Sequence, residues 1–320
     1  MLLQSAFPLL ALGFTILAWH EPDNLLPWDS SQPILLALLL FILSLNIRWQ
    51  DCLRLWRKPG PVMVGITSQW LLVPLLAWLT IQLLPVQSQD QTGLLLTATA
   101  ACSMLVPAFV LIAGGDLALA LVLTLTTPLW QLLTSRWITP LITGAPDTSI
   151  PLPVYEQLWL LPAIIAGVSC QHWLPELRQR LHSYLPATVM ALLLGLMAIQ
   201  TASQQDLLAM MVLPPLTISS AVLFCLLCGT GGYWLARTQH LTPAQCRTIA
   251  LQTGLPAATV ASLTAMQASG LESAAVPLLI LCWQPVGAAC AAGYWHWQTQ
   301  RQIRTIQRTS RPISFDPRQP

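Results

Sequence analysis

The sequence predicts an all-α polytopic membrane protein with ten transmembrane helices. Three observations lead to this fold class. Apolar residues make up 55% of the 320 residues, charged residues make up 8%, and the mean hydropathy is +0.63, which lies outside the range of soluble domains. Long apolar runs alternate with short polar gaps. Basic and acidic residues occupy different gaps, in strict alternation along most of the chain.

The charge pattern also predicts the orientation. Thirteen of the 14 Lys and Arg residues follow the second, sixth, eighth and tenth apolar runs. These are Arg48, Arg54, Arg57, Lys58, Arg178, Arg180, Arg237, Arg247, Arg301, Arg304, Arg308, Arg311 and Arg318. The intervening gaps hold Glu21, Asp23, Asp29, Asp90, Asp147, Glu156, Asp206 and Glu272. Because short basic loops stay in the cytoplasm, we expect both termini there, with the chain in a bacterial inner membrane.

A basic tail of five Arg residues beside a final span is typical of contact with lipid head groups. Membrane lipid is therefore a predicted partner, whereas nucleic acid and an obligate protein partner are not.

A helix that crosses the bilayer needs about 20 residues. The predicted spans are Leu2–Trp19, Ile34–Ile47, Pro61–Leu84, Thr92–Ala113, Leu117–Thr143, Leu158–Cys170, Tyr184–Ile199, Leu207–Ala236, Ile249–Ala268 and Ala274–Trp297.

The order short, short, long, long, long occurs twice among these spans. An odd number of spans in each half makes the second half enter the membrane in the opposite sense, which is typical of inverted-repeat transporters. The sequence thus predicts a first repeat in residues 1–150, a second in residues 151–300 and a basic cytoplasmic tail in residues 301–320.

The fourth span of each half contains a proline near its middle. Met104–Ala108 reads MLVPA and Gly254–Ala258 reads GLPAA. Proline removes a backbone donor and clashes with the preceding turn, so we expect helices 4 and 9 to be broken and to cross. The alternative is coincidence, since the chain has 26 prolines and membrane helices tolerate them.

Several motifs resemble the bile acid:sodium symporter family. The resemblance extends over residues 38–140 and 232–295. The motifs are LRLWRKPGPV at 53–62, QWLLVP at 69–74, GDLALALVLT at 115–124, TP at 139–140, GYWLAR at 232–237, RTIA at 247–250 and QTGL at 252–255.

This resemblance implies a panel domain of spans one, two, six and seven and a core domain of the other six. It also implies that two sodium ions bind behind the crossing of helices 4 and 9, and that a small organic anion binds between core and panel. Transport would follow from rotation of one domain relative to the other.

The chain departs from the sodium ligands that the resemblance implies. It keeps Gln69 and Thr124, but it has Val106 and Pro107 at a Ser-Asn pair, Ala120 at a Ser, Gln252 at a Glu and Pro256 at a Gln. Sodium requires several oxygen ligands, and a carboxylate offsets the cost of its dehydration. We therefore expect incomplete remnants of sodium sites at Gln69, Thr124 and Gln252, without the usual two-sodium coupling, and no other cofactor.

The candidate substrate-binding residues lie near the two breaks. They are Ser103, Pro107, Gln252, Thr253, Pro256, Thr259 and Gln284. The polar side chains among them can equally form hydrogen bonds between helices.

No span combines a nucleophile with a base, so an enzyme is not expected. A sensor that binds a ligand without transporting it stays open as the alternative to a transporter.

Overall fold

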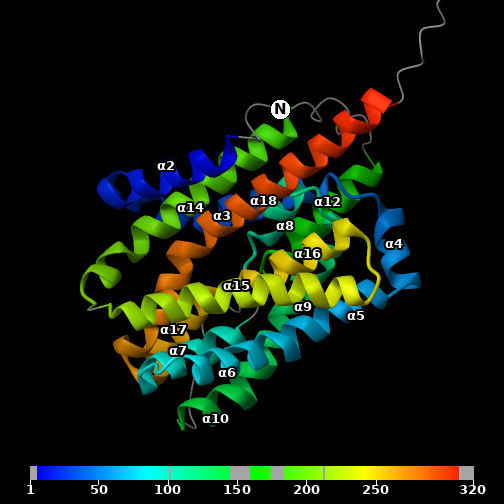
Figure 1. The fold of residues 1–320 in the computed structure, drawn as a ribbon. Coiled ribbons are helices and arrows are strands. Elements are labelled where there is room, and N and C mark those ends of the chain that lie inside the picture. Colours follow the sequence, from blue (N-terminus) through cyan, green and yellow to red (C-terminus); the bar gives the residue numbers. More distant parts are fainter. Residues whose placement is uncertain (1–5, 101, 145–158, 174–183, 212, 310–320) are drawn as a thin grey trace, which may run out of the picture.

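A computed structural model describes residues 6–100, 102–144, 159–173, 184–211 and 213–309. Within these ranges every named element is a helix (Figure 1). The predicted boundary between residues 150 and 151 and the end of the tail, residues 310–320, lie outside the described part.

The helices follow the predicted apolar runs, several of them divided into shorter pieces. In chain order they are α2 (Phe7–His20), η1 (Pro22–Asn24), η2 (Leu26–Ser31), α3 (Gln32–Ser44), α4 (Trp49–Arg57), α5 (Gly60–Thr67), η3 (Ser68–Leu72), α6 (Val73–Leu83), α7 (Ser88–Thr99), α8 (Val106–Ile112), α9 (Leu117–Leu133), η4 (Thr134–Ile138), α10 (Thr139–Thr143), α12 (Leu161–Trp173), α14 (Leu185–Ala209), α15 (Pro215–Thr238), α16 (Pro243–Gly254), α17 (Ala258–Ser269), η5 (Leu271–Ala274) and α18 (Ala275–Thr309).

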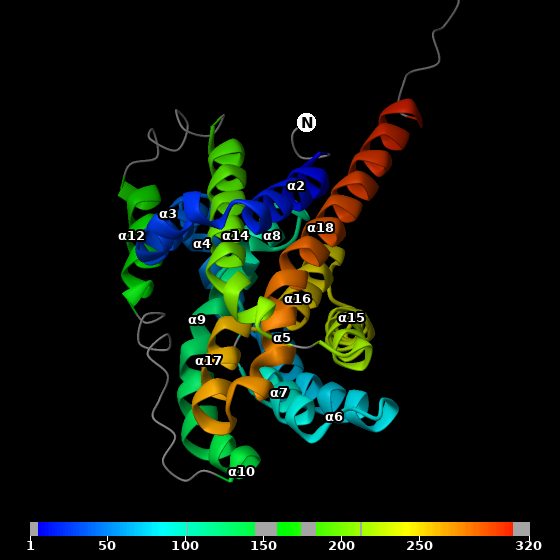
Figure 2. The same cartoon turned by 90° about the vertical axis from the view of Figure 1, so that its left-hand side faces the viewer.

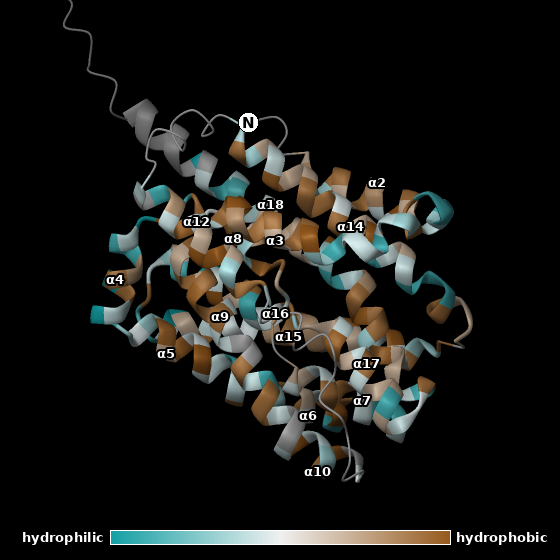
Figure 3. Ribbon diagram, turned by 180° about the vertical axis from the view of Figure 1, so that it is seen from behind, coloured by the Kyte–Doolittle hydropathy of each residue, from teal (hydrophilic) through white to brown (hydrophobic). Residues whose placement is uncertain are grey.

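Within the described residues, five segments are long and apolar enough to cross a membrane by length and composition. They are Pro22–Ser44, Gly60–Leu83, Leu185–Ala209, Pro215–Thr238 and Leu271–Thr299. Shorter apolar helices accompany them, among them α2 and α9. Apolar residues cover much of the helix surface, while hydrophilic residues gather around α4 and at turns (Figure 3). Exposed side chains such as Leu9 and Ile34 fit a lipid environment better than water.

The helices form two packed groups. In one group α3 packs against α12, and α14 packs against both α2 and α3. In the other, α15 packs against α16, α18 and α6, while α7 packs against α6, α17 and α18. Figure 2 shows α2, α3, α12 and α14 together, with α15 and α6 on the far side of α18 and α16. The groups meet where α18 contacts α2 and α14 and where α3 contacts α8.

Polar contacts tie the helix ends together at two places far apart in the fold. At the first, Arg54 of α4 lies 3.3 Å from Asp116, and Arg247 of α16 donates to Ala113 O at 3.1 Å and to Thr299 Oγ1 at 2.8 Å. At the second, Thr217 Oγ1 of α15 donates to Asp90 Oδ2 of α7 at 2.7 Å. The basic segments that follow the second and eighth apolar runs therefore both contact the segment between Ala113 and Asp116, as the charge pattern predicts.

Three elements differ from the sequence prediction. The predicted seventh span, Tyr184–Ile199, is too short, because α14 continues to Ala209 through Gln and Ala residues that favour helix. Helix α18 likewise continues to Thr309, into the predicted tail. The basic stretch after run two forms the amphipathic helix α4, which buries Leu55 and whose first turn is held by an Arg48 N–H to Asp51 Oδ2 bond of 3.4 Å.

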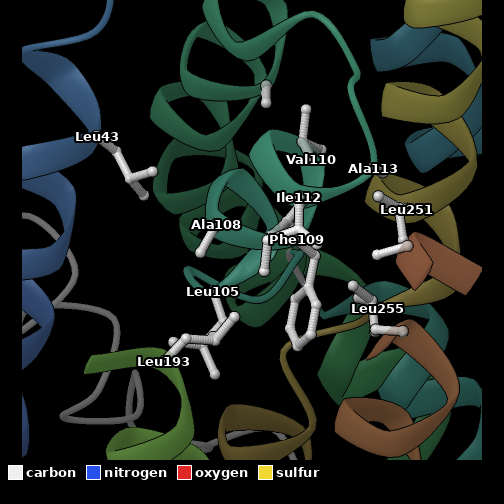
Figure 4. Packing of buried hydrophobic residues seen from close by; sticks show 14 of the residues in the cluster. Leu43, Leu105, Ala108, Phe109, Val110, Ile112, Ala113, Leu193, Leu251 and Leu255 are labelled. Carbon is white, nitrogen blue, oxygen red and sulfur yellow. The ribbon is translucent and has the colours of Figure 1, made fainter. Parts of the chain in front are cut away.

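The largest hydrophobic cluster lies where the two groups of helices meet. Leu105 and Phe109 of the α8 region pack beside Leu43 of α3, Leu193 of α14 and Leu255 (Figure 4). These side chains are almost fully buried, and van der Waals packing of this kind holds membrane helices together. The short helix α8 is thereby held between the two groups.

Candidate functional site

The predicted fourth span is interrupted between two helices. Helix α7 ends at Thr99 and α8 begins at Val106, with residues 100 and 102–105 outside both helices. Pro107 lies in the first turn of α8, where its missing N–H costs nothing because that position has no intrahelical acceptor. The interruption therefore precedes Pro107 by about one turn, whereas the sequence pattern placed it around the proline itself.

The predicted ninth span is interrupted in the same way. Helix α16 ends at Gly254 and α17 begins at Ala258, so Pro256 lies in the gap. Gly254 lies against α15: a Cβ there would come within 3.1 Å of Gly229 Cα. A side chain at this position would push α16 away from α15.

The two interruptions cross each other. Cys102 pairs with Pro256 as an isolated antiparallel bridge, and Ser103 N–H donates to Leu255 O at 2.8 Å. Unpaired backbone groups are costly in a membrane interior. Each interruption thus supplies backbone partners for the other.

A cavity of about 470 Å³ lies against this crossing, between the two groups of helices. We call it the α14 cavity. Its polar lining residues are Asp29, Gln32, Ser103, Gln200, Ser203, Gln204 and Thr259. Two of the predicted substrate residues, Ser103 and Thr259, are therefore brought together. The α14 residues Gln200, Ser203 and Gln204 were not predicted, since they lie beyond the apolar run that marked the seventh span.

A second cavity, of about 440 Å³, also lies between the two groups. We call it the α9 cavity. Its lining is mainly apolar and includes Leu125 of α9, Ile164 of α12 and Cys52 of α4. Ile164 is one helical turn from Leu160, which lines the α14 cavity. Burial, and then the neighbouring Asp51 carboxylate, raise the pKa of the Cys52 thiol, so this thiol stays neutral around pH 7.

Gln69 and Gln252 face a small shared cavity beside the crossing. Gln69 Nε2 donates to Ala100 O at 3.4 Å, and Gln252 Nε2 contacts Cys102 Sγ. Both amide nitrogens thus contact residues of the fourth-span interruption. Both Oε1 atoms are buried without a hydrogen-bond partner. Gln69 lies in the π-helical segment η3, and such segments frequently occur at functional sites.

The other predicted residues lie apart from the α14 cavity. Thr253 is buried against α15 and donates to Cys228 O at 2.9 Å. Thr124 Oγ1 donates to Ala120 O at 2.8 Å within its own helix. Gln284 lines a groove between α15, α16 and α18, and its Oε1 has no partner. Pro107 is buried in the α8 packing and Pro256 in the bridge.

Residues 33–211 match the sodium bile acid symporter family. The chain belongs to this family. Its members are transporters, which agrees with the expectation that the chain is not an enzyme. Family membership and the apolar helices together make it an integral membrane protein.

Sequence identity to individual relatives is low, but the matches extend over about two thirds or more of this chain. The chain is 24% identical over 304 residues to the probable sodium/metabolite cotransporter BASS2, chloroplastic, of Oryza sativa subsp. japonica, covering 92% of this chain and 71% of the relative. It is 20% identical over 307 residues to the uncharacterized sodium-dependent transporter YocS of Bacillus subtilis, covering 92% of each. It is 26% identical over 225 residues to the mouse sodium/bile acid cotransporter 5, covering 66% of this chain and 49% of the relative.

The residues beside the crossing fit a sodium pair poorly. Gln69 and Gln252 offer two unpartnered amide oxygens, but no carboxylate lines their cavity. A sodium ion at this depth would lack the negative charge that offsets its dehydration.

Proposed function

We propose that this protein is a secondary transporter that moves a small organic anion by alternating access without the usual two-sodium coupling. The observation that carries the proposal is the α14 cavity, because it touches both interrupted helices at their crossing and both helix groups. Its volume of about 470 Å³ lies within the range of roughly 300–1,000 Å³ typical of small-molecule sites.

The anionic character of the substrate is supported by the start of α17. Ala257, Thr259 and Val260 line the α14 cavity, so the N-terminus of this 12-residue helix borders it. The first amides of a helix lack intrahelical acceptors and carry partial positive charge. Interrupted helices in other transporters bind anionic groups in this way. Ser103 and Thr259 provide hydroxyl groups beside these amides.

Two cavities between the same helix groups support alternating access. In this proposal α2, α3, α12 and α14 form the panel, and the remaining spans form the core. The proposed topology is ten crossings in two inverted five-helix repeats. The α14 cavity is the outer compartment and the α9 cavity the inner one, with both termini cytoplasmic in a bacterial inner membrane. A rotation of the panel against α8 would close one compartment and open the other.

The loss of two-sodium coupling is supported by Gln69 and Gln252. Their amide nitrogens contact Ala100 and Cys102, so neutral hydrogen bonds hold the interruption together without an ion. A neutral amide at residue 252 leaves no charge that a bound sodium ion would neutralise.

Proteoliposome uptake tests both parts of the proposal. Radiolabelled monocarboxylates, dicarboxylates and a bile acid are offered in NaCl and in KCl. We expect saturable uptake of at least one anion, at rates in the two salts that agree within about twofold. Binding without uptake would support the sensor alternative, and a steep sodium dependence would show that coupling survives.

Gln252→Glu tests the role of the missing charge. Since a ligand that binds the native state raises its apparent stability, we expect NaCl to raise the melting temperature of Gln252→Glu above its value in KCl. The matched control is Gln284→Glu, because Gln284 is also buried with an unpartnered Oε1 but lies in a different cavity. Neither wild type nor this control should respond to sodium.

A further inference from the structure

A third cavity, which the proposed transport cycle does not use, lies between α15, α16 and α18. We call it the α15 groove; its volume is about 320 Å³. It shares no lining residue with the α14 or α9 cavity. Figure 2 shows α15 beside α16 and α18, on the side away from α3 and α12. Its lining residues Leu226, Trp234 and Trp283 are 55%, 61% and 41% exposed, so the groove opens toward the lipid.

Glycines from all three helices line the groove. Gly229 of α15, Gly254 of α16 and Gly287 of α18 all line it. A Cβ at Gly287 would make an ordinary van der Waals contact with Trp283 Nε1 at 3.6 Å, so a side chain could be accommodated there without a clash. Gln284 also lines the groove, but it is only 4% exposed. The surface offered to a ligand is therefore mainly apolar, with Thr230 and Tyr233 as its other polar lining residues.

One end of the groove carries positive charge. Arg237, in the last turn of α15, places its guanidinium carbon 5.8 Å from the ring centroid of Trp234. Nearby, Tyr233 stacks on Trp295 with ring centroids 6.2 Å apart. The sequence has no Asp or Glu from residue 207 to residue 271. Aromatic and Arg residues in this arrangement typically lie at the level of lipid head groups.

We propose that the α15 groove binds one acyl chain of an anionic phospholipid, with the lipid phosphate at Arg237. The apolar lining matches the chain, the opening matches entry from the bilayer, and the charge at the end matches the head group. An Arg near the membrane surface favours an anionic over a neutral lipid by about fivefold. The ligand would touch α15, α16 and α18, all of which belong to the proposed core.

Native mass spectrometry of the full-length protein in detergent tests the proposal. The protein is titrated with phosphatidylglycerol or phosphatidylcholine of the same chain length. We expect about fivefold tighter binding of phosphatidylglycerol, and Arg237→Gln should reduce it to the level of phosphatidylcholine. Gly287→Leu fills the groove and should reduce the binding of both lipids.

Gly13→Leu is the matched control, because Gly13 is exposed on α2 and a Cβ there meets no atom within 4 Å. It should leave lipid binding unchanged. Equal binding of the two lipids by wild type would contradict a head-group site at Arg237. Lipid binding by Gly287→Leu at the wild-type level would contradict an acyl-chain site in the α15 groove. Competition by glycerol phosphate as strong as that by the whole lipid would show a head-group site without a chain. Arg237 is exposed, so its variant keeps the test valid if Gly287→Leu does not fold.

Discussion

Cys102 and Pro256 lie opposite each other in an antiparallel bridge where two interrupted helices cross. Pro256 has no N–H to donate, and the adjoining hydrogen bond runs from Ser103 N–H to Leu255 O at 2.8 Å. The two interruptions are far apart in sequence, yet each satisfies backbone groups of the other. A change in one is therefore expected to disturb the helix that contains the other.

The bridge predicts a specific cross-link. Residues opposite each other in an antiparallel pair have Cα atoms about 4.5–5.5 Å apart, which lies within the range that a disulfide spans. We expect Pro256→Cys to form a disulfide with Cys102 under mild oxidation, detected by mass spectrometry of the joined peptides. Leu255→Cys is the control, since its side chain points the other way. Cross-linking of the control in place of Pro256→Cys would show a different register.

The buried pair of Asp90 and Thr217 predicts a stability difference. Thr217 is 1% exposed and Asp90 6%, and their hydrogen bond measures 2.7 Å. Thr217→Val keeps the shape but leaves the carboxylate unpaired, so we expect the free energy of unfolding to fall by about 1.5–3 kcal/mol. Denaturant titration in detergent measures this loss.

Thr238→Val serves as the control for that pair. Its hydroxyl is exposed and bonds only to Leu235 O of its own helix, at 2.8 Å. The expected change is within about 0.5 kcal/mol. Similar losses for the two variants would show that Asp90 does not depend on Thr217.

Local signals explain which parts of the fold the sequence predicts well. Pro107 and Pro256 mark the two interruptions, because proline acts on its own turn of helix. The exact position is missed at Pro107, since a proline fits the first turn after an interruption as well as the interruption itself. Helix α4 is missed because Arg54, Arg57 and Lys58 resemble a loop, whereas Leu55 anchors it to the core.

The candidate site depends on long-range packing that a single sequence does not show. Thr253 looks equivalent to Gln252, yet it turns toward α15, where Gly232 leaves room for it. Cys102 resembles any apolar residue of a span, and its contact with Gln252 joins residues 150 positions apart. Ser103 and Thr259 line one cavity because both follow directly from the interruptions.

Two helical glycines predict changes of opposite sign. A Cβ at Gly167 of α12 would lie 2.6 Å from Phe41 O, a backbone atom of α3 that does not move easily. We expect Gly167→Ala to lower the free energy of unfolding by about 1–3 kcal/mol. At Gly195 of α14 no atom lies within 4 Å, so Gly195→Ala should raise it by about 0.5–1 kcal/mol. A Gly167→Ala variant as stable as wild type would argue against the packing of α12 on α3.

Asp116 has two roles that separate variants can distinguish. Its Oδ1 accepts the Leu119 N–H at 3.1 Å and caps α9, while its Oδ2 lies 3.3 Å from Arg54 Nη2. Loss of such a cap costs about 0.5–2 kcal/mol. The Arg54 side chain is 58% exposed, and exposed ion pairs contribute about 0–1 kcal/mol. The cap should therefore dominate.

Melting temperatures of three variants measure which role is larger. Asp116→Ala removes both interactions and should lower the melting temperature clearly. Asp116→Asn keeps the cap, because Asn and Asp are equally good N-caps, and Arg54→Ala removes only the ion pair, so both should stay near wild type. If Arg54→Ala were as damaging as Asp116→Ala, the ion pair would be the main tie between α4 and the start of α9.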